Sequence, residues 1–136
     1  MTAEAQEGYQ DSLEIHRPSE LIRTVTRSTF ESLVLQGVGP IAVEFMSYGC
    51  GHCRALEPVL QQVAAMLKGK EKIFRVNLAA EPGLAASFEV AGTPTFIMFI
   101  NGGEAGRADG PPPTVSSVLN AIRRPVEIID PGMEID

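Results

Sequence analysis

The residues best suited to chemistry in this chain are Cys50-Gly51-His52-Cys53, which include its only two cysteines. The preceding residues, 41–46, are mostly apolar and predict a strand, and the following residues carry apolar side chains at helical spacing. Two thiols with two residues between them, where a strand leads into a helix, are typical of a dithiol/disulfide redox site.

The start of the helix indicates which thiol reacts. A thiolate attacks a disulfide, whereas a thiol does not. The first helical turn offers N–H groups without partners and the positive end of the helix dipole, so we expect a lowered pKa for Cys50, the nucleophile. Cys53 lies one turn later, and we expect it to be more buried and to resolve the mixed disulfide formed by Cys50.

Gly51 and His52 occupy the positions that tune such a site. Two intervening residues let a small disulfide ring close without disrupting the first helical turn. A protonated His52 places positive charge near Cys50 and favours the thiolate further. Because a stable thiolate stabilises the reduced form, we expect a more oxidising site than a Gly-Pro sequence would give.

Two alternative roles for the cysteine pair are less favoured. A structural zinc needs four ligands, and the cysteines have only His52, poorly placed between them, and the distant His16. A purely structural disulfide is disfavoured because so short a loop constrains the unfolded chain only weakly. We therefore expect neither a metal nor another cofactor.

Composition and charge narrow the class of protein. The chain has 136 residues, of which 44% are hydrophobic, as suits one globular domain. Residues 1–20 and 126–136 each carry a net charge of −4, while residues 21–125 carry +2, giving −6 in all. The acidic ends argue against nucleic-acid binding. With no apolar run of about 20 residues and no basic, apolar leader, we expect a cytoplasmic protein away from membranes.

The pattern along the chain predicts alternating strands and helices. We expect an acidic N-terminal extension (1–20), a domain (21–125) and an acidic C-terminal tail (126–136). Ser28 and Glu31 fit a capping box at the start of the first helix. Asn101-Gly102 predicts a hairpin, with the following Gly103 suggesting a three-residue loop or a bulge. The expected strands are 21–26, 41–46, 72–78, 95–100 and 104–109, and the expected helices begin near 28, 53, 82 and 114.

Several motifs in order resemble the thioredoxin superfamily. They are Val43-Glu44-Phe45, Cys50-Gly51-His52-Cys53, Pro58, Val76-Asn77, Gly92-Thr93-Pro94-Thr95 and Asn101-Gly102, and they cover residues 21–124. The resemblance implies an α/β thioredoxin fold, with a mixed sheet of four or five strands flanked by about four helices. It also implies thiol–disulfide exchange with protein substrates and with a partner reductase or oxidase. We expect a monomer.

The resemblance assigns roles to three further residues. Pro94 matches the family's cis-proline beside the dithiol, although by position alone it could simply start a strand. The Thr93 backbone is then free to pair with an extended substrate segment. Glu44 takes the place of a buried acid behind the second cysteine, and we expect it to exchange the Cys53 proton. The alternative is that Glu44 pairs with Arg75 or Lys72 on the next strand.

The chain also departs from the family. The frequent tryptophan before the first cysteine is Gly49 here, and the chain contains no tryptophan. The Gly-His pair resembles protein disulfide isomerases more than reducing thioredoxins, and glutathione-poised cytosol would keep such a dithiol largely reduced. A non-catalytic interaction or redox-sensing module of the same fold is the alternative to an enzyme.

Overall fold

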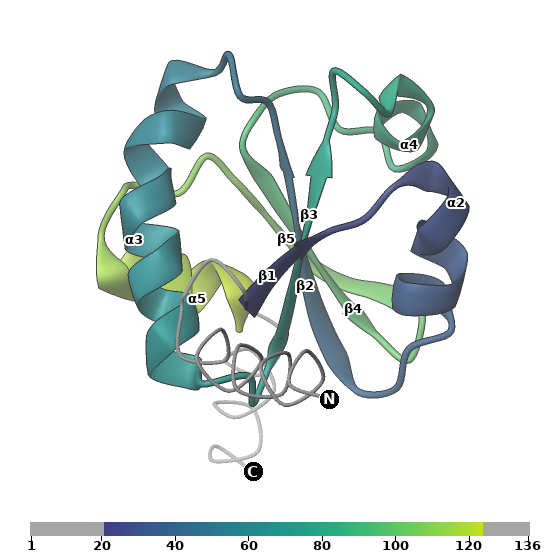
Figure 1. Cartoon of the computed structure of the whole chain (residues 1–136), viewed down its shortest axis with the longest axis horizontal. Helices are drawn as coiled ribbons and strands as arrows, with labels where there is room; N and C mark the ends of the chain where they lie inside the picture. Colours follow the sequence, from purple (N-terminus) through teal and green to yellow (C-terminus); the bar gives the residue numbers. More distant parts are fainter. Residues whose placement is uncertain (1–20, 124–136) are drawn as a thin grey trace, which may run out of the picture.

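A computed structural model describes residues 21–123 as a central sheet between two layers of helices (Figure 1). The predicted order of strands and helices is confirmed. The expected extension (1–20) and tail (126–136) lie outside the described residues. The elements are β1 (Ile22–Thr24), α2 (Arg27–Phe30), η2 (Glu31–Leu35, a π-helical continuation of α2), β2 (Pro40–Met46), α3 (Gly51–Leu67), β3 (Lys72–Asn77), α4 (Pro82–Ser87), β4 (Thr95–Ile100), β5 (Gly103–Asp109) and α5 (Val115–Ile122).

The sheet has five strands in the order β1-β3-β2-β4-β5. The strands β1, β3 and β2 run parallel, whereas β4 is antiparallel to β2 and β5 is antiparallel to β4. Strand β2 lies in the middle, and every residue in it except Pro40 is buried. A strand covered on both faces needs an almost continuous apolar run, which is why residues 41–46 predicted this position correctly.

Each face of the sheet has its own core. Helices α3 and α5 cover one face, where Leu56 and Val118 are fully buried. Helices α2 and α4 cover the other face with η2, and there the ring centroid of Phe88 lies 5.3 Å from that of Phe30 and 5.5 Å from that of Phe99. The two cores fix the sheet between the helical layers, so the end of β2 and the start of α3 are held on a rigid frame.

Helix α3 carries the dithiol at its first turn and packs on the sheet along its length. Its buried residues follow the predicted helical spacing, and Pro58 lies inside it. The helix ends at Lys68, whose backbone is left-handed (φ 52°), and Gly69 follows with φ 78°. The buried residues of α3 are Cys53, Leu56, Leu60, Val63 and Ala64.

The first helix begins two residues before the predicted capping box. Thr26, not Ser28, is the N-cap, and its backbone N–H donates to the Thr29 hydroxyl at 2.9 Å. Thr26 and Thr29 thus take the two positions assigned to Ser28 and Glu31. The prediction failed because hydroxyl side chains at 26, 28 and 29 offer the same capping chemistry at more than one position.

The β4–β5 hairpin is confirmed with a shorter loop than one alternative predicted. Asn101 and Gly102 alone form the loop, with φ values of 51° and 87°. Two successive positive φ values are what a type I′ turn requires. The three-residue loop is therefore wrong, and the bulge lies further along the pair, where the register skips Ala105.

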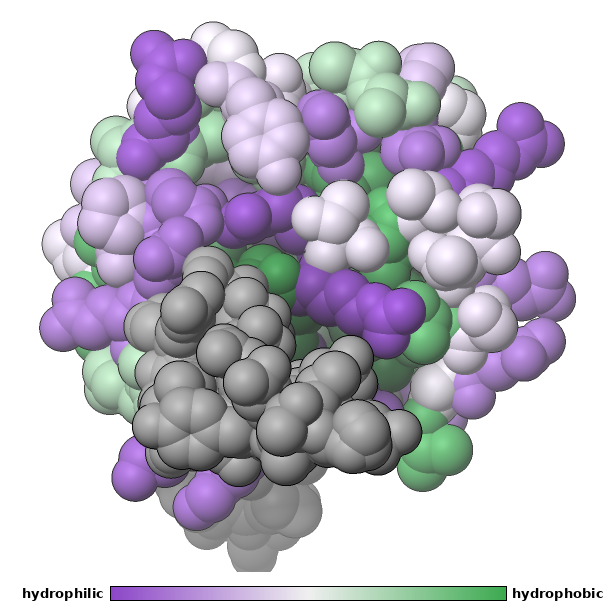
Figure 2. All heavy atoms as spheres, in the orientation of Figure 1, coloured by the Kyte–Doolittle hydropathy of each residue, from purple (hydrophilic) through white to green (hydrophobic). Residues whose placement is uncertain are grey.

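The described surface is mostly polar with scattered apolar side chains. Figure 2 shows hydrophilic residues over much of one face, with hydrophobic ones in smaller patches between them. The large apolar residues that are exposed come from different segments, as is normal for a folded domain. Within residues 21–123, no helix has the length and apolarity needed to cross a membrane. The exposed residues are Leu35, Val38, Tyr48 and Met66.

Two glycines with positive φ provide a test of the hairpin packing. A Cβ on Gly102 would clash with the backbone carbonyl of Leu35, whereas a Cβ on Gly69 would meet nothing within 4 Å. We expect Gly69→Ala to lower the free energy of unfolding by about 1–2 kcal/mol, the cost of a left-handed alanine. We expect Gly102→Ala to cost about 2–5 kcal/mol because overpacking is added. Urea unfolding of the three proteins checks this, and equal losses would contradict it.

Candidate active site

The Cys50 sulfur lies at the N-terminus of α3 and is held there by the backbone. Cys50 is the N-cap, with an extended backbone (φ −84°, ψ 121°), and its Sγ accepts a hydrogen bond from the Cys53 N–H at 3.2 Å. The Cys50 N–H donates in turn to the Ser47 carbonyl at 3.0 Å, closing the short turn after β2. The predicted placement of the pair, where a strand leads into a helix, is confirmed.

The two thiols lie in different surroundings. Cys50 is partly exposed, whereas the Cys53 side chain is buried, and neither is in a disulfide. This is the predicted asymmetry, and it follows from the helix geometry. The N-cap residue lies at the open end of the helix, and a residue one turn later faces the sheet.

The same geometry separates the pKa values of the two thiols. Burial opposes ionisation of Cys50, but hydrogen bonds from the side chains of Cys53 and Thr93 and from the backbone N–H groups of Cys53 and His52 outweigh it and lower the pKa of Cys50. Burial, followed by the hydrogen bond to Cys50, raises the pKa of Cys53 to about 11. Cys50 therefore ionises at a lower pH than Cys53, whose thiol stays neutral at neutral pH.

The predicted proline lies beside the dithiol. The Thr93–Pro94 peptide bond is cis, as the resemblance implied. The Cys50 thiol donates to the Thr93 carbonyl at 3.5 Å, so residues 43 positions apart meet at the reactive sulfur. The Pro94 carbonyl accepts from the Gly110 N–H at 2.8 Å, which ties this loop to the end of β5. The substrate-binding roles of Thr93 and Pro94 stay predictions.

His52 contacts the loop after β5. Its Nε2 lies 3.0 Å from the Pro111 carbonyl oxygen, and its ring is packed close to Gly110. His52 lowers the pKa of Cys50 through a hydrogen bond from its backbone N–H. Gly51 has open space around its Cα. The redox-tuning roles of His52 and Gly51 stay predictions.

Glu44 is fully buried on β2, and it is paired. Arg75 Nε on the adjacent strand β3 donates to Glu44 Oε1 at 3.2 Å. Of the two alternative partners predicted for Glu44, Arg75 and Lys72, Arg75 is the one that pairs with it. Arg75 is nevertheless shared, because its guanidinium also forms an ion pair with Glu57 on α3. Glu44 Oε2 has no hydrogen-bond partner among the described residues.

Burial dominates the ionisation of Glu44. Desolvation raises the pKa of Glu44 from 4.5 to about 7, against the opposing attraction of Arg75, and repulsion from Glu57 adds to the rise. A carboxyl group with this pKa can both take up and release a proton near neutral pH. The raised pKa is as predicted, and the exchange of a proton with Cys53 stays a prediction.

A groove of about 410 Å³ runs beside the dithiol. It is lined by His52, by residues of the 89–95 segment that includes Thr93 and Pro94, and by residues 107–110 at the end of β5. The β5 side of this groove and the contact of Glu57 with Arg75 were not predicted from the sequence. Arg107 and Asp109 lie on β5, a strand in which no functional residue was predicted. Their relation to Pro94 becomes visible only when β5 pairs with β4.

Among residues 21–123, no three His, Cys, Asp or Glu side chains gather closely enough to hold a metal ion. His16, weighed above as a zinc ligand, lies outside the described residues.

The fold and the site together define an α/β protein with a reactive dithiol at a helix N-terminus and a cis-proline beside it. The model of the thioredoxin family matches residues 21–123. The chain is 34% identical over 97 residues to "Thioredoxin 1" of Nostoc sp., covering 70% of this chain and 91% of that protein. This chain belongs to the thioredoxin family, and the fold and family predicted from its motifs are confirmed.

Two further relatives show the range within the family. "Probable protein disulfide-isomerase A6" of Medicago sativa is 37% identical over 95 residues, or 68% of this chain and 26% of that protein. "Thioredoxin M2, chloroplastic" of Arabidopsis thaliana is 32% identical over 101 residues, or 73% of this chain and 54% of that protein. The chain thus spans about a quarter and about half of their lengths. Family membership supports thiol–disulfide oxidoreductase chemistry at Cys50 and Cys53.

Glu44 makes the stability of the folded protein depend on pH. Its pKa in the folded protein (about 7) exceeds its ordinary value (4.5), so the folded state holds the proton more tightly. Stability from Glu44 is therefore fully present below about pH 4.5 and is lost as the pH rises to about 7. Glu44→Gln has no carboxyl group to titrate. As the pH rises from 4.5 to about 7, we therefore expect the wild type to lose about 3 kcal/mol of unfolding free energy relative to this variant.

Glu57→Gln supplies a second variant for the same pH window. Removing the Glu57 charge lowers the pKa of Glu44, because repulsion is lost and Arg75 no longer serves two carboxylates. We expect Glu44 to begin losing its proton at a lower pH in this variant. Denaturant unfolding at a series of pH values measures both effects. A flat difference between Glu44→Gln and the wild type from pH 4 to 8 would contradict the expectation.

Proposed function

We propose that this chain is a protein-disulfide oxidoreductase that exchanges its Cys50/Cys53 dithiol for the disulfide of a protein substrate. The observation that carries the proposal is the contrast between the two thiols. Cys50 is partly exposed with a lowered pKa, and Cys53 is buried with a pKa raised to about 11. A nucleophile must be ionised and reachable, and a resolving thiol must stay neutral until it is needed.

The reaction proceeds in two exchanges. The Cys50 thiolate attacks one substrate sulfur, so a mixed disulfide forms and the second substrate sulfur leaves as a thiolate. Cys53 then loses its proton and attacks the Cys50 sulfur, which closes the Cys50–Cys53 disulfide and releases the first substrate sulfur. Two electrons pass from the protein to the substrate, and the two substrate thiolates take up protons. The reverse sequence oxidises a dithiol substrate.

Three groups support these steps in the proposed mechanism. The helix N-terminus stabilises the Cys50 sulfur whenever it carries negative charge. The Thr93–Pro94 loop aligns the substrate segment beside Cys50. Glu44 accepts the Cys53 proton in the second exchange, through a water if the two are not in direct contact, because its pKa of about 7 allows it to be ionised at neutral pH.

The setting proposed for this chemistry is cytoplasmic, with a partner reductase that returns the dithiol to its reduced form. A glutathione-poised cytosol keeps such a dithiol largely reduced, the form in which Cys50 attacks. Some relatives carry the word chloroplastic in their names, so the compartment within this family varies.

The two cysteine variants separate an enzyme from a non-catalytic module. With a model protein that has an exposed disulfide, we expect Cys53→Ser to accumulate a covalent mixed disulfide, because Cys50 still attacks and nothing resolves the product. Non-reducing electrophoresis and intact mass measure the adduct. Cys50→Ser is the matched control, and it should form no adduct and show only background turnover. Unchanged turnover in Cys50→Ser would exclude the proposal.

A further inference from the structure

The groove beside the dithiol is the natural place for the substrate residues next to the reacting cysteine. Thr93 lines the groove, and its carbonyl oxygen lies 3.5 Å from the Cys50 sulfur. We therefore expect a peptide whose sulfur bonds to Cys50 to place a neighbouring side chain beside the groove wall. The chemistry of that wall then bears on which peptides react.

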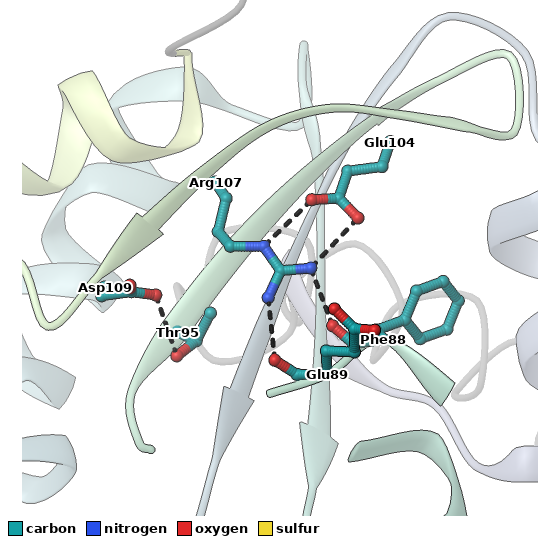
Figure 3. Close-up of polar contacts among 6 residues, drawn as sticks. All are labelled: Phe88, Glu89, Thr95, Glu104, Arg107 and Asp109. Atoms are coloured by element: carbon teal, nitrogen blue, oxygen red, sulfur yellow. Dashed lines mark hydrogen bonds and ion pairs between the residues drawn. The ribbon is translucent and has the colours of Figure 1, made fainter. Parts of the chain in front are cut away.

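The positively charged Arg107 side chain in the groove already forms hydrogen bonds within the protein. Figure 3 shows the Arg107 guanidinium between Glu104 and the backbone of Phe88 and Glu89. It donates to the two carboxylate oxygens of Glu104 at 2.9 and 3.1 Å, to the Phe88 carbonyl at 2.7 Å and to the Glu89 carbonyl at 3.2 Å. Arg107 thus acts here as a tie between β5 and the segment after α4.

Glu89 follows the C-cap residue of α4, Phe88, and has the left-handed backbone that commonly ends a helix. Glu89 has φ 54°, in the left-handed region that residues with a side chain rarely adopt. Its carbonyl accepts from Arg107, and its N–H donates to the Ala86 carbonyl at 3.2 Å. The Val90 N–H donates to the Ala85 carbonyl at 2.9 Å, so the two bonds form a Schellman motif that ends α4. Here it places an exposed carboxylate residue on the rim of the groove.

A second carboxylate lines the groove from β5. Asp109, at the end of β5, is exposed and lines the groove, and its Oδ1 accepts from the Thr95 hydroxyl at 3.4 Å (Figure 3). Neither Asp109 nor Glu89 forms an ion pair with any residue among 21–123. Arg107 attracts both Glu89 and Asp109, but its single positive charge is shared with Glu104 as well, so the three carboxylates leave a local excess of two negative charges at the groove.

We propose that this groove selects protein substrates that carry a lysine or arginine beside the disulfide cysteine. The proposal rests on the proposed function and adds its substrate class. A basic side chain next to the substrate sulfur gains attraction from Glu89 and Asp109 as Cys50 attacks, and an acidic one is repelled. Rim charges of this kind act mainly on the rate of association and on the choice of partner.

Two synthetic peptides test the selection. They differ only in the residues that flank a central cysteine, two lysines or two glutamates, and the cysteine is carried as its mixed disulfide with thionitrobenzoate. Attack by the Cys50 thiolate on the peptide sulfur forms a new disulfide and releases the coloured thionitrobenzoate anion. Each second-order rate constant is divided by that of 2-mercaptoethanol with the same peptide, which removes the intrinsic reactivity of the peptide.

For the wild-type reduced protein we expect the lysine peptide to react about fivefold faster than the glutamate peptide after this correction. We expect the ratio to approach one in the double variant Glu89→Gln/Asp109→Asn. The control Glu31→Gln removes a carboxylate from η2, away from the groove, and should keep the wild-type ratio. In the wild type, the ratio should also fall as ionic strength rises from about 0.02 to about 0.5 M, because salt screens exposed charges.

The outcomes separate the selection from the chemistry. Equal corrected rates for the two peptides, or a preference that survives both the double variant and high salt, would overturn the selection while leaving the exchange reaction intact. Failure of Cys50 to release thionitrobenzoate from either peptide would instead overturn the proposed function, and the selection with it.

Discussion

The hydrogen bond from the Cys53 N–H to the Cys50 sulfur, 3.2 Å long, is the contact on which the site depends. It exists because α3 begins at Gly51, so the N-cap sulfur faces N–H groups that have no partner within the helix. The same turn of helix exposes the first thiol and buries the second. The start of α3 thus determines that the Cys50 sulfur is exposed and ionises first, and that the Cys53 sulfur is buried and stays neutral.

The rest of the fold keeps that helix end in place. The sheet is packed on both faces, so the end of β2 and the start of α3 cannot shift separately, and the cis Thr93–Pro94 loop reaches the sulfur from β4. Behind the dithiol, Arg75 is divided between Glu44 and Glu57. A buried acid that shares its arginine with a second carboxylate keeps a raised pKa. An ion pair with an unshared arginine would lower it.

Much of this could be predicted from the sequence, because the signals are local. The apolar run of β2, the helical spacing after Cys53 and the Asn101-Gly102 turn each constrain their own segment, and the ordered motifs identify the fold that joins them. The first helix was misplaced because neighbouring hydroxyls offered equivalent caps. The Arg75 pair was only an alternative, because the sequence does not show which side chains of adjacent strands meet.

The groove could not be predicted from the sequence, for a different reason. Arg107 donates to the carbonyl oxygens of Phe88 and Glu89. Every residue has a backbone carbonyl, so the sequence does not show which of them Arg107 binds. The left-handed backbone of Glu89 is likewise unusual for its residue type, so propensity would not find it. Asp109 reaches the dithiol region only through the pairing of β5 with β4. Contacts of this kind require the tertiary structure.

The most direct measurement is the alkylation of the reduced protein by iodoacetamide across pH, with each cysteine followed by peptide mass spectrometry. The account predicts that Cys50 is modified first, with a midpoint below the ordinary cysteine value of about 8.5. Cys53 should stay unmodified until far higher pH, consistent with its pKa of about 11. Equal modification of both thiols with one midpoint near 8.5 would contradict the central claim.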